Sequence, residues 1–185
     1  MEIYDYILEL EKRAKSASAA MNTASDETRR AVLLDLADRV EAASADILAA
    51  NALDLAAAAD NGGPTPMLGR LRLPHARLSG MAEAVRALAH LDDPVGGGKT
   101  WTTPAGLTIT ERRVPLGVVA MIFEARPNVT LDAAALCIRS GNAAVLRGGK
   151  EAIESGRAIC RVIGDALEAH GLPRDGVCFV ERTER

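Results

Sequence analysis

The sequence contains few aromatic residues, few cysteines and no excess of positive charge. Only 3% of its 185 residues are aromatic, too few for a stacking surface that binds single-stranded nucleic acid. The formal net charge is -3, whereas a nucleic-acid-binding protein needs a clustered basic face, so we expect no nucleic-acid partner. The cysteines, Cys137, Cys160 and Cys178, are too few and too scattered for a disulfide framework or a zinc site, and we expect no metal.

Long apolar runs and targeting signals are also missing. The opening stretch MEIYDYILELEKRAK interleaves acids and bases with apolar residues, which is not typical of a secretory signal. No apolar run is long enough to span a bilayer, so we expect a cytoplasmic protein with no membrane partner. A hydrophobic content of 48% and a charged content of 25% are typical of a globular chain with a substantial core.

The first half of the chain has helical periodicity. Ile3, Ile7, Leu10 and Ala14 form one stripe, and a second helix is expected after Ser25, which can cap it. Further helices are expected over 45–60 and from Pro74 onward, with the NGGPTP stretch between them as a loop. We therefore expect residues 1–105 to be a helical segment that packs on the domain that follows.

The second half alternates strands and helices. Residues 107–110 alternate in polarity, as a half-exposed strand does. Continuous apolar runs then predict three strands that are buried on both faces, at 116–123, 142–147 and 176–181. Helices are expected between them, at 129–141 and 150–171. Strand–helix–strand crossovers predict a Rossmann-type parallel sheet, with a βαβαβ unit in residues 114–181 of an α/β domain over 106–185.

The stretch DPVGGGKTW superficially resembles a nucleotide-triphosphate loop. That loop requires a glycine five positions before Gly98, a strand before it and a helix after it, but Asp93 occupies the glycine position. A helix is expected before the stretch, and Pro104 and Gly106 exclude a helix after it. We therefore interpret this stretch as a flexible connector.

A better ligand site follows from topology, because ligands of open parallel sheets bind beyond the carboxyl ends of the strands. The first of these strands ends in EARPN (residues 124–128) and the second ends in RGGK (residues 147–150). The glycines would let a ligand approach the backbone, and the flanking bases would attract an anion. The alternative is an ordinary glycine-rich turn with solvated bases, a helix-capping Asn128 and a surface Arg126. No GxGxxG fingerprint follows any strand.

The run VPLGVVAMIFEARPNVTLDAAALCIRSGNAAVLRGGKEA resembles the γ-glutamyl phosphate reductase family, within the aldehyde dehydrogenase superfamily. Supporting phrases are NALDLAAA and PAGLTI. The resemblance implies a glutamate-5-semialdehyde dehydrogenase of proline biosynthesis. Such an enzyme reduces L-glutamyl 5-phosphate with NADPH to L-glutamate 5-semialdehyde and phosphate, through a cysteine thioester. It also implies a cofactor domain, a catalytic domain and an oligomerisation strand, and hence a homo-oligomer.

The resemblance also assigns residues. It implies that Asn128 donates its amide to the developing oxyanion. Arg126 is a candidate contact for the substrate. In the superfamily a glutamate beside the adenosine ribose would repel a 2′-phosphate, whereas two bases stand here, which agrees with NADP(H). The implied cofactor residues are Arg147, Gly148, Gly149 and Lys150.

One departure from the family concerns the nucleophile. The family's cysteine, followed by Asn-Ala, has no counterpart in this chain, and the resemblance places it beyond residue 185. We expect the three cysteines present to be packed core thiols, so this chain alone would be inactive and incomplete relative to the family. The alternatives are a truncated, non-catalytic module that binds a nucleotide or a partner, and a structural subunit that completes another chain's sheet.

Overall fold

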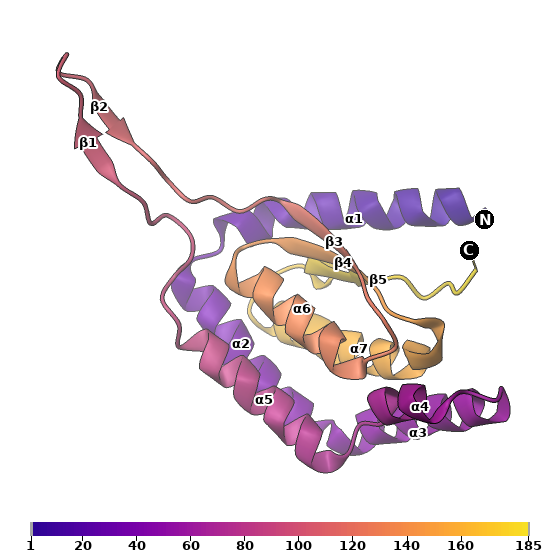
Figure 1. Ribbon diagram of the computed structural model, residues 1–185. Coiled ribbons are helices and arrows are strands. Elements are labelled where there is room, and N and C mark those ends of the chain that lie inside the picture. The colour runs from indigo at the N-terminus through magenta and orange to yellow at the C-terminus, as the bar shows by residue number, and fades with distance from the viewer. Residues whose placement is uncertain (1, 185) are drawn as a thin grey trace.

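The computed structural model describes residues 2–184 and is built around a three-stranded parallel sheet (Figure 1). The strand order is β3 (Val118–Ile122), β4 (Ala143–Arg147), β5 (Val177–Phe179). Helix α1 (Ile3–Thr23) covers one face of this sheet. Helices α6 (Pro127–Arg139) and α7 (Ile153–Ala169) cover the other. The predicted parallel βαβαβ arrangement is confirmed.

The remaining helices form a further layer outside α6 and α7 (Figure 1). Their bounds are α2 Asp26–Ala42, α3 Ser44–Asp60, α4 Thr65–Leu71 and α5 His75–Ala89. Short 3-10 turns, η1 (Lys150–Ala152) and η2 (Arg174–Gly176), precede α7 and β5. Within residues 2–184 no single helix meets the length and apolarity of a membrane span; α2 and α3 meet them only as a pair, bent by 67°.

The expected helix boundaries have local causes. The Ser25 hydroxyl oxygen accepts a hydrogen bond from the Thr28 N–H at 3.1 Å, which caps α2 as predicted. Gly141 and Gly171 have φ values of +72° and +73°, the left-handed conformation that favours glycine where a helix ends. These two glycines turn the chain from α6 into β4 and from α7 toward β5.

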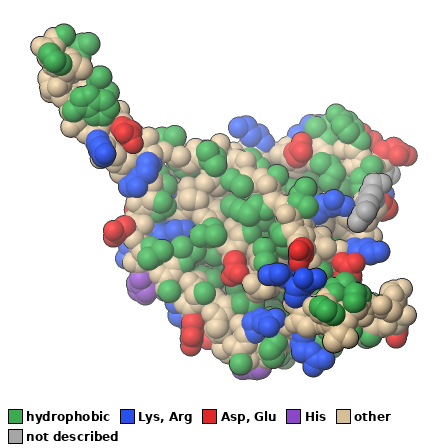
Figure 2. All heavy atoms as spheres, in the orientation of Figure 1, with side chains coloured by type: hydrophobic (Ala, Val, Ile, Leu, Met, Phe, Trp, Pro, Cys, Tyr) green, Lys and Arg blue, Asp and Glu red, His purple; other side chains and the backbone are tan. Residues whose placement is uncertain are grey.

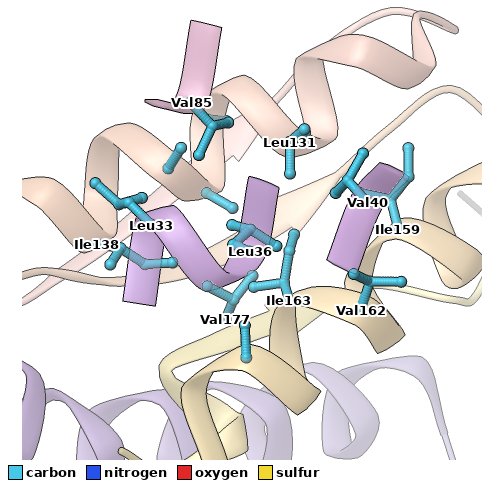
Figure 3. Close-up of a cluster of buried hydrophobic side chains, with 14 of the residues drawn as sticks. Leu33, Leu36, Val40, Val85, Leu131, Ile138, Ile159, Val162, Ile163 and Val177 are labelled. Atoms are coloured by element: carbon cyan, nitrogen blue, oxygen red, sulfur yellow. The ribbon is translucent and has the colours of Figure 1, made fainter. Parts of the chain in front are cut away.

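The main core lies between α2 and the two helices that cover the sheet (Figure 3). Leu36 of α2 meets Ile163 of α7 and Val177 of β5 in this cluster, and all three are buried. Burial of one such side chain contributes about 1.5–3 kcal/mol. The helical first half therefore shares one hydrophobic core with the sheet.

Two buried arginines link the helices through hydrogen bonds near the amino end of α2. Arg29 donates to the Ala24 carbonyl at 3.0 Å and to the Asp93 carboxylate at 2.7 Å. Arg139, at the end of α6, donates to the Asp26 carboxylate and to the Leu91 carbonyl. Both arginines are 2% exposed, so these bonds compensate for the cost of burying charge.

Three expectations about local structure are wrong. The NGGPTP stretch is not wholly a loop, because α4 begins at Thr65, where Pro66 fits the first turn of a helix. The strand predicted over 116–123 is not buried on both faces, since β3 is an edge strand and Leu116 and Ile122 are 86% and 79% exposed. The strand predicted over 107–110 has no buried face, because all four residues are exposed, with Leu107 at 66% and Ile109 at 40%.

That exposed strand, β2 (Thr108–Thr110), pairs antiparallel with β1 (Thr100–Thr102). The two form an arm that projects from the helices and the parallel sheet (Figure 1). Figure 2 shows hydrophobic side chains along this arm, and Trp101, Leu107 and Ile109 are among the exposed apolar residues. Among the described residues, no other strand or helix packs on this arm. The alternating polarity of residues 107–110 therefore does not produce a buried face.

Candidate functional site

The loops that follow β3 and β4 lie side by side. Both strands end at the same edge of the parallel sheet, and the Phe123 N–H donates to the Arg147 carbonyl at 3.0 Å. A Cβ added to Gly149 would lie 2.7 Å from the backbone nitrogen of Ala125, and one added to Gly148 would lie 3.2 Å from the Phe123 ring. Close packing against the neighbouring loop therefore already favours glycine at both positions. That these glycines also let a ligand approach the backbone stays a prediction.

The second loop borders a cavity of about 360 Å³. Arg147 and Lys150 give it positive charge, Glu151 opposes them, and Phe123 supplies an apolar wall. Lys150 is exposed, while Arg147 is half-buried and donates to the Glu184 carbonyl at 3.3 Å. Cations beside an apolar surface match a nucleotide, which combines a flat base with phosphate. All the residues predicted to bind the cofactor, 147–150, border this cavity.

The first loop borders a different cavity, of about 550 Å³, next to α4 and α5. The structure brings the predicted pair Arg126 and Asn128 together on its wall. Figure 2 shows Lys and Arg side chains gathered next to α4. The other residues on this wall are Gly69, Arg70, Arg77, Gly80, Met81, Ala84 and Asp132.

Asn128 stands in the first turn of α6 and is not its cap, because Arg126 occupies the N-cap position. The half-buried Asn128 amide donates to the Asp132 carboxylate at 3.1 Å. An amide nitrogen carries two hydrogens, so one N–H is left for a ligand in the cavity. Burial raises the pKa of Asp132, and the Asn128 hydrogen bond lowers it in part.

Sequence reasoning missed three charged residues of this cavity. Asp132 follows Asn128 by four positions, the spacing that places two side chains on one helix face. The predicted helix over this segment was therefore enough to predict this pair. Arg70 and Arg77 come from α4 and α5, and no pattern in the sequence connects them with residue 128. The packing of α5 against α6 brings Arg77 there, and Arg70 comes with α4, which packs on α3.

The three cysteines are poor nucleophiles. Burial raises the pKa of Cys137 to about 11 and, with a smaller contribution from Asp175, that of Cys178 to about 11. Burial also raises the pKa of Cys160 strongly. Within residues 2–184 no group of His, Cys, Asp and Glu side chains could hold a metal ion.

The glycine-rich segment before β1 connects α5 to the exposed arm. Its backbone pairs with residues 111–113: Glu111 N–H donates to the Lys99 carbonyl at 2.8 Å, and Arg113 N–H donates to the Gly97 carbonyl at 2.9 Å. A Cβ at Gly98 would lie 1.9 Å from the Glu111 carbonyl oxygen. The glycines allow two backbones to approach closely, and the segment leads into a strand rather than into the helix that a phosphate loop requires.

Known proteins closely resemble the chain. A γ-glutamyl phosphate reductase from Erwinia tasmaniensis is 49% identical over 176 residues, which is 93% of this chain and 42% of that protein. The chain is homologous to the γ-glutamyl phosphate reductases. The crystal structure of this enzyme from Thermotoga maritima superposes with a TM-score of 0.92 at 34% identity, over 96% of this chain and 43% of that one. The chain thus spans less than half the length of these reductases. No protein-family model matches it.

More distant structures share the fold of this chain. A putative aldehyde dehydrogenase from Bacillus subtilis covers 95% of this chain and 36% of its own, with a TM-score of 0.71 at 21% identity. PnpE, solved in complex with nicotinamide adenine dinucleotide, covers 92% of this chain and 32% of its own, with a TM-score of 0.72 at 24% identity. The aldehyde-dehydrogenase-like fold predicted from the resemblance is confirmed.

Proposed function

We propose that the complete protein is a γ-glutamyl phosphate reductase, which reduces L-glutamyl 5-phosphate with NADPH to L-glutamate 5-semialdehyde and phosphate. The observation that carries this proposal is the position of Asn128. Its amide borders an arginine-lined cavity, and its loop abuts the RGGK loop that follows β4. The homology supports the same reaction.

Asn128 stabilises the negative charge that develops on the substrate's carbonyl oxygen. The N–H that does not bind Asp132 is the donor, and the bond to Asp132 holds the amide in place beforehand. Pre-orientation matters because the donor then needs no rearrangement when the charge appears. Arg126, on the same wall, contacts an anionic group of the substrate. The nucleophile is a cysteine of the complete protein.

The NADP(H) site is the cavity beside residues 147–150. The residues present fit this cofactor, because Phe123 offers an apolar wall and two cations flank the loop. Arg147 and Lys150 hold the 2′-phosphate, while Gly148 and Gly149 keep the loop close to the sheet. When bound, NADPH supplies the hydride of the reduction.

The division of the chain follows from these roles. Residues 106–185 form the start of the NADP-binding domain, and residues 1–105 form the helical segment that packs on it. The exposed apolar arm, β1 and β2, supports assembly of the complete enzyme into a homo-oligomer, because an apolar edge of this kind favours association. The proposed location is the cytoplasm.

The test is phosphate-dependent reduction of NADP⁺ with L-glutamate 5-semialdehyde, the reverse reaction, by the complete protein. Wild type should turn over only when phosphate is present. Asn128→Ala should lower kcat by about 10²–10³-fold, the usual effect of removing one oxyanion donor. NADPH binding without any turnover would instead favour the non-catalytic nucleotide-binding module. Full activity of Asn128→Ala would remove the proposed oxyanion role.

A further inference from the structure

We infer that Arg70 and Arg77 join Arg126 to form a binding site for an oxyanion of the substrate, either a carboxylate or a phosphate. This inference rests on the proposed reductase function and extends it to residues of α4 and α5. The three arginines border one cavity of about 550 Å³, and Asn128 borders the same cavity. A ligand that fills this cavity therefore borders all four residues.

Two of the guanidiniums share one acidic neighbour. Arg70 Nε lies 3.8 Å and Arg126 Nε lies 3.6 Å from the same carboxylate oxygen of Glu124. Arg70 comes from the last turn of α4 and Arg126 from the start of α6, so Glu124 lies between two bases that are far apart in sequence. Both side chains are about half exposed, which leaves them open to a ligand from the cavity.

The third guanidinium is positioned by backbone. Arg77 Nη1 donates to the Arg72 carbonyl at 2.7 Å, a neutral acceptor that leaves the positive charge of Arg77 uncompensated. Arg77 has no salt bridge to an acid among the described residues. Because a guanidinium carries five N–H donors, Arg77 keeps donors for a ligand while one donor fixes its orientation.

The charge on the wall of this cavity favours an anion. Three arginines face two carboxylates here: Asp132 on the wall, and Glu124, which pairs with Arg70 and Arg126; one positive charge is in excess. Burial raises the pKa of Asp132, and its carboxylate accepts the Asn128 amide hydrogen bond rather than pairing with an arginine. Arginine binds a carboxylate or a phosphate through two parallel hydrogen bonds, so several arginines around one hollow form a suitable oxyanion site.

Two helical glycines open the same cavity. Gly80 lies in the interior of α5 and Gly69 lies in α4, positions where alanine would favour the helix more. No neighbouring atom requires glycine at either place, because a Cβ there would have nothing within 4 Å. Glycine at these points leaves room for a ligand to approach the helix backbone. This observation is independent of the charges and points to the same cavity.

The decisive variants are Arg70→Gln and Arg77→Gln in the complete protein, with Arg72→Gln as the matched control. Arg72 lies between the two in sequence, is exposed and does not border the cavity. In the phosphate-dependent reverse reaction, each test variant should raise the KM for phosphate or for glutamate 5-semialdehyde at least tenfold. The KM for NADP⁺ should stay the same. A rise for phosphate identifies the phosphate as the bound oxyanion, and a rise for the semialdehyde identifies its carboxylate.

A second variant, Gly80→Leu, fills the cavity without removing a charge, and it should raise the same KM. Calorimetric titration with inorganic phosphate and with L-glutamate supplies a readout that does not need turnover. Wild type and Arg72→Gln should bind one of these anions, and Arg77→Gln should bind it at least tenfold more weakly. The inference would be overturned if the wild type is active and the arginine variants have the same KM values as the wild type. It would also be overturned if all variants bind the anion as tightly as the wild type. A wild type that binds the anion through these arginines but does not turn over would overturn only the proposed function.

Discussion

The Asp54 carboxylate of α3 accepts two hydrogen bonds from Ser155, from its backbone N–H at 2.8 Å and from its hydroxyl at 2.6 Å. The Glu154 N–H also donates to Asp54, at 3.0 Å. Both N–H groups belong to the first turn of α7, whose own N-cap residue, Ala152, has no capping side chain. A carboxylate from another helix thus caps α7 just after the RGGK loop.

We expect Asp54→Asn to destabilise the protein by about 1–3 kcal/mol, the cost of leaving a buried donor unsatisfied. Three donors converge on the Asp54 carboxylate, and an amide offers only one acceptor atom and turns its own N–H groups toward them. Urea unfolding measures the change. Asp60→Asn is the control, because Asp60 is exposed at the end of the same helix. Equal stability of the two variants would show that the cap contributes little.

The ion pair of Asp26 predicts a pH dependence. The Arg139 hydrogen bond holds the pKa of Asp26 below its usual range, although burial opposes the shift. Because the folded-state pKa is lower than the unfolded value, this pair stabilises the fold above about pH 4. The stabilisation is lost as the pH falls through the lowered pKa.

Asp26→Asn should therefore reduce the free energy of unfolding at pH 7 by about 1 kcal/mol, after allowance for solvent screening. The difference from wild type should shrink as the pH is lowered toward 3. Denaturant unfolding at both pH values measures it, with Glu27→Gln, an exposed neighbour, as the control. A difference that is the same at both pH values would contradict the assignment to this carboxylate.

The sequence pattern predicted the structural features that depend only on residues close together in sequence. The Ser25 cap, the terminal Gly141 and Gly171, and the buried strand β4 follow from capping, backbone freedom and apolar runs. It failed for β3, because an apolar run does not reveal whether a strand is central or at the edge of a sheet. It also failed for the arm, where pairing between β1 and β2 replaces packing on the core.

The candidate site was predictable to a similar extent. Topology and family resemblance selected the EARPN and RGGK loops, and the structure places them side by side. Arg70, Arg77 and the Asp54 cap were not predictable, since each depends on how one helix packs against another far away in sequence. Side chains brought together only by tertiary packing have no signature in a single sequence.

Lys99→Ala should leave NADPH affinity unchanged, and ATP should not raise the melting temperature of the protein. The reason is that the Lys99 carbonyl accepts the Glu111 N–H and the segment leads into β1, so the helix that a phosphate loop requires does not follow it. Thermal-shift measurements with and without ATP test both statements. An ATP-dependent rise in melting temperature that Lys99→Ala abolishes would restore the phosphate-loop interpretation.

The thiols should react slowly and support no catalysis. With a pKa of about 11, only about one in a thousand Cys137 or Cys178 side chains is a thiolate at pH 8. Iodoacetamide labelling of the 185-residue chain should therefore be much slower before unfolding than after it, and the chain should lack reductase activity. Turnover by this chain that is lost on replacing any one cysteine would show that the nucleophile is among them.

The central claim is that the loop after β4 binds NADPH through its 2′-phosphate. The most direct measurement is calorimetric titration of the complete protein with NADPH and with NADH, in wild type and in Lys150→Glu. A charged hydrogen bond contributes about 1.5–3 kcal/mol, so Lys150→Glu should weaken NADPH binding by roughly 10–150-fold. The affinity for NADH should change little, so the difference in affinity between NADPH and NADH should become smaller. An equal loss for both cofactors, or no loss for either, would contradict the claim.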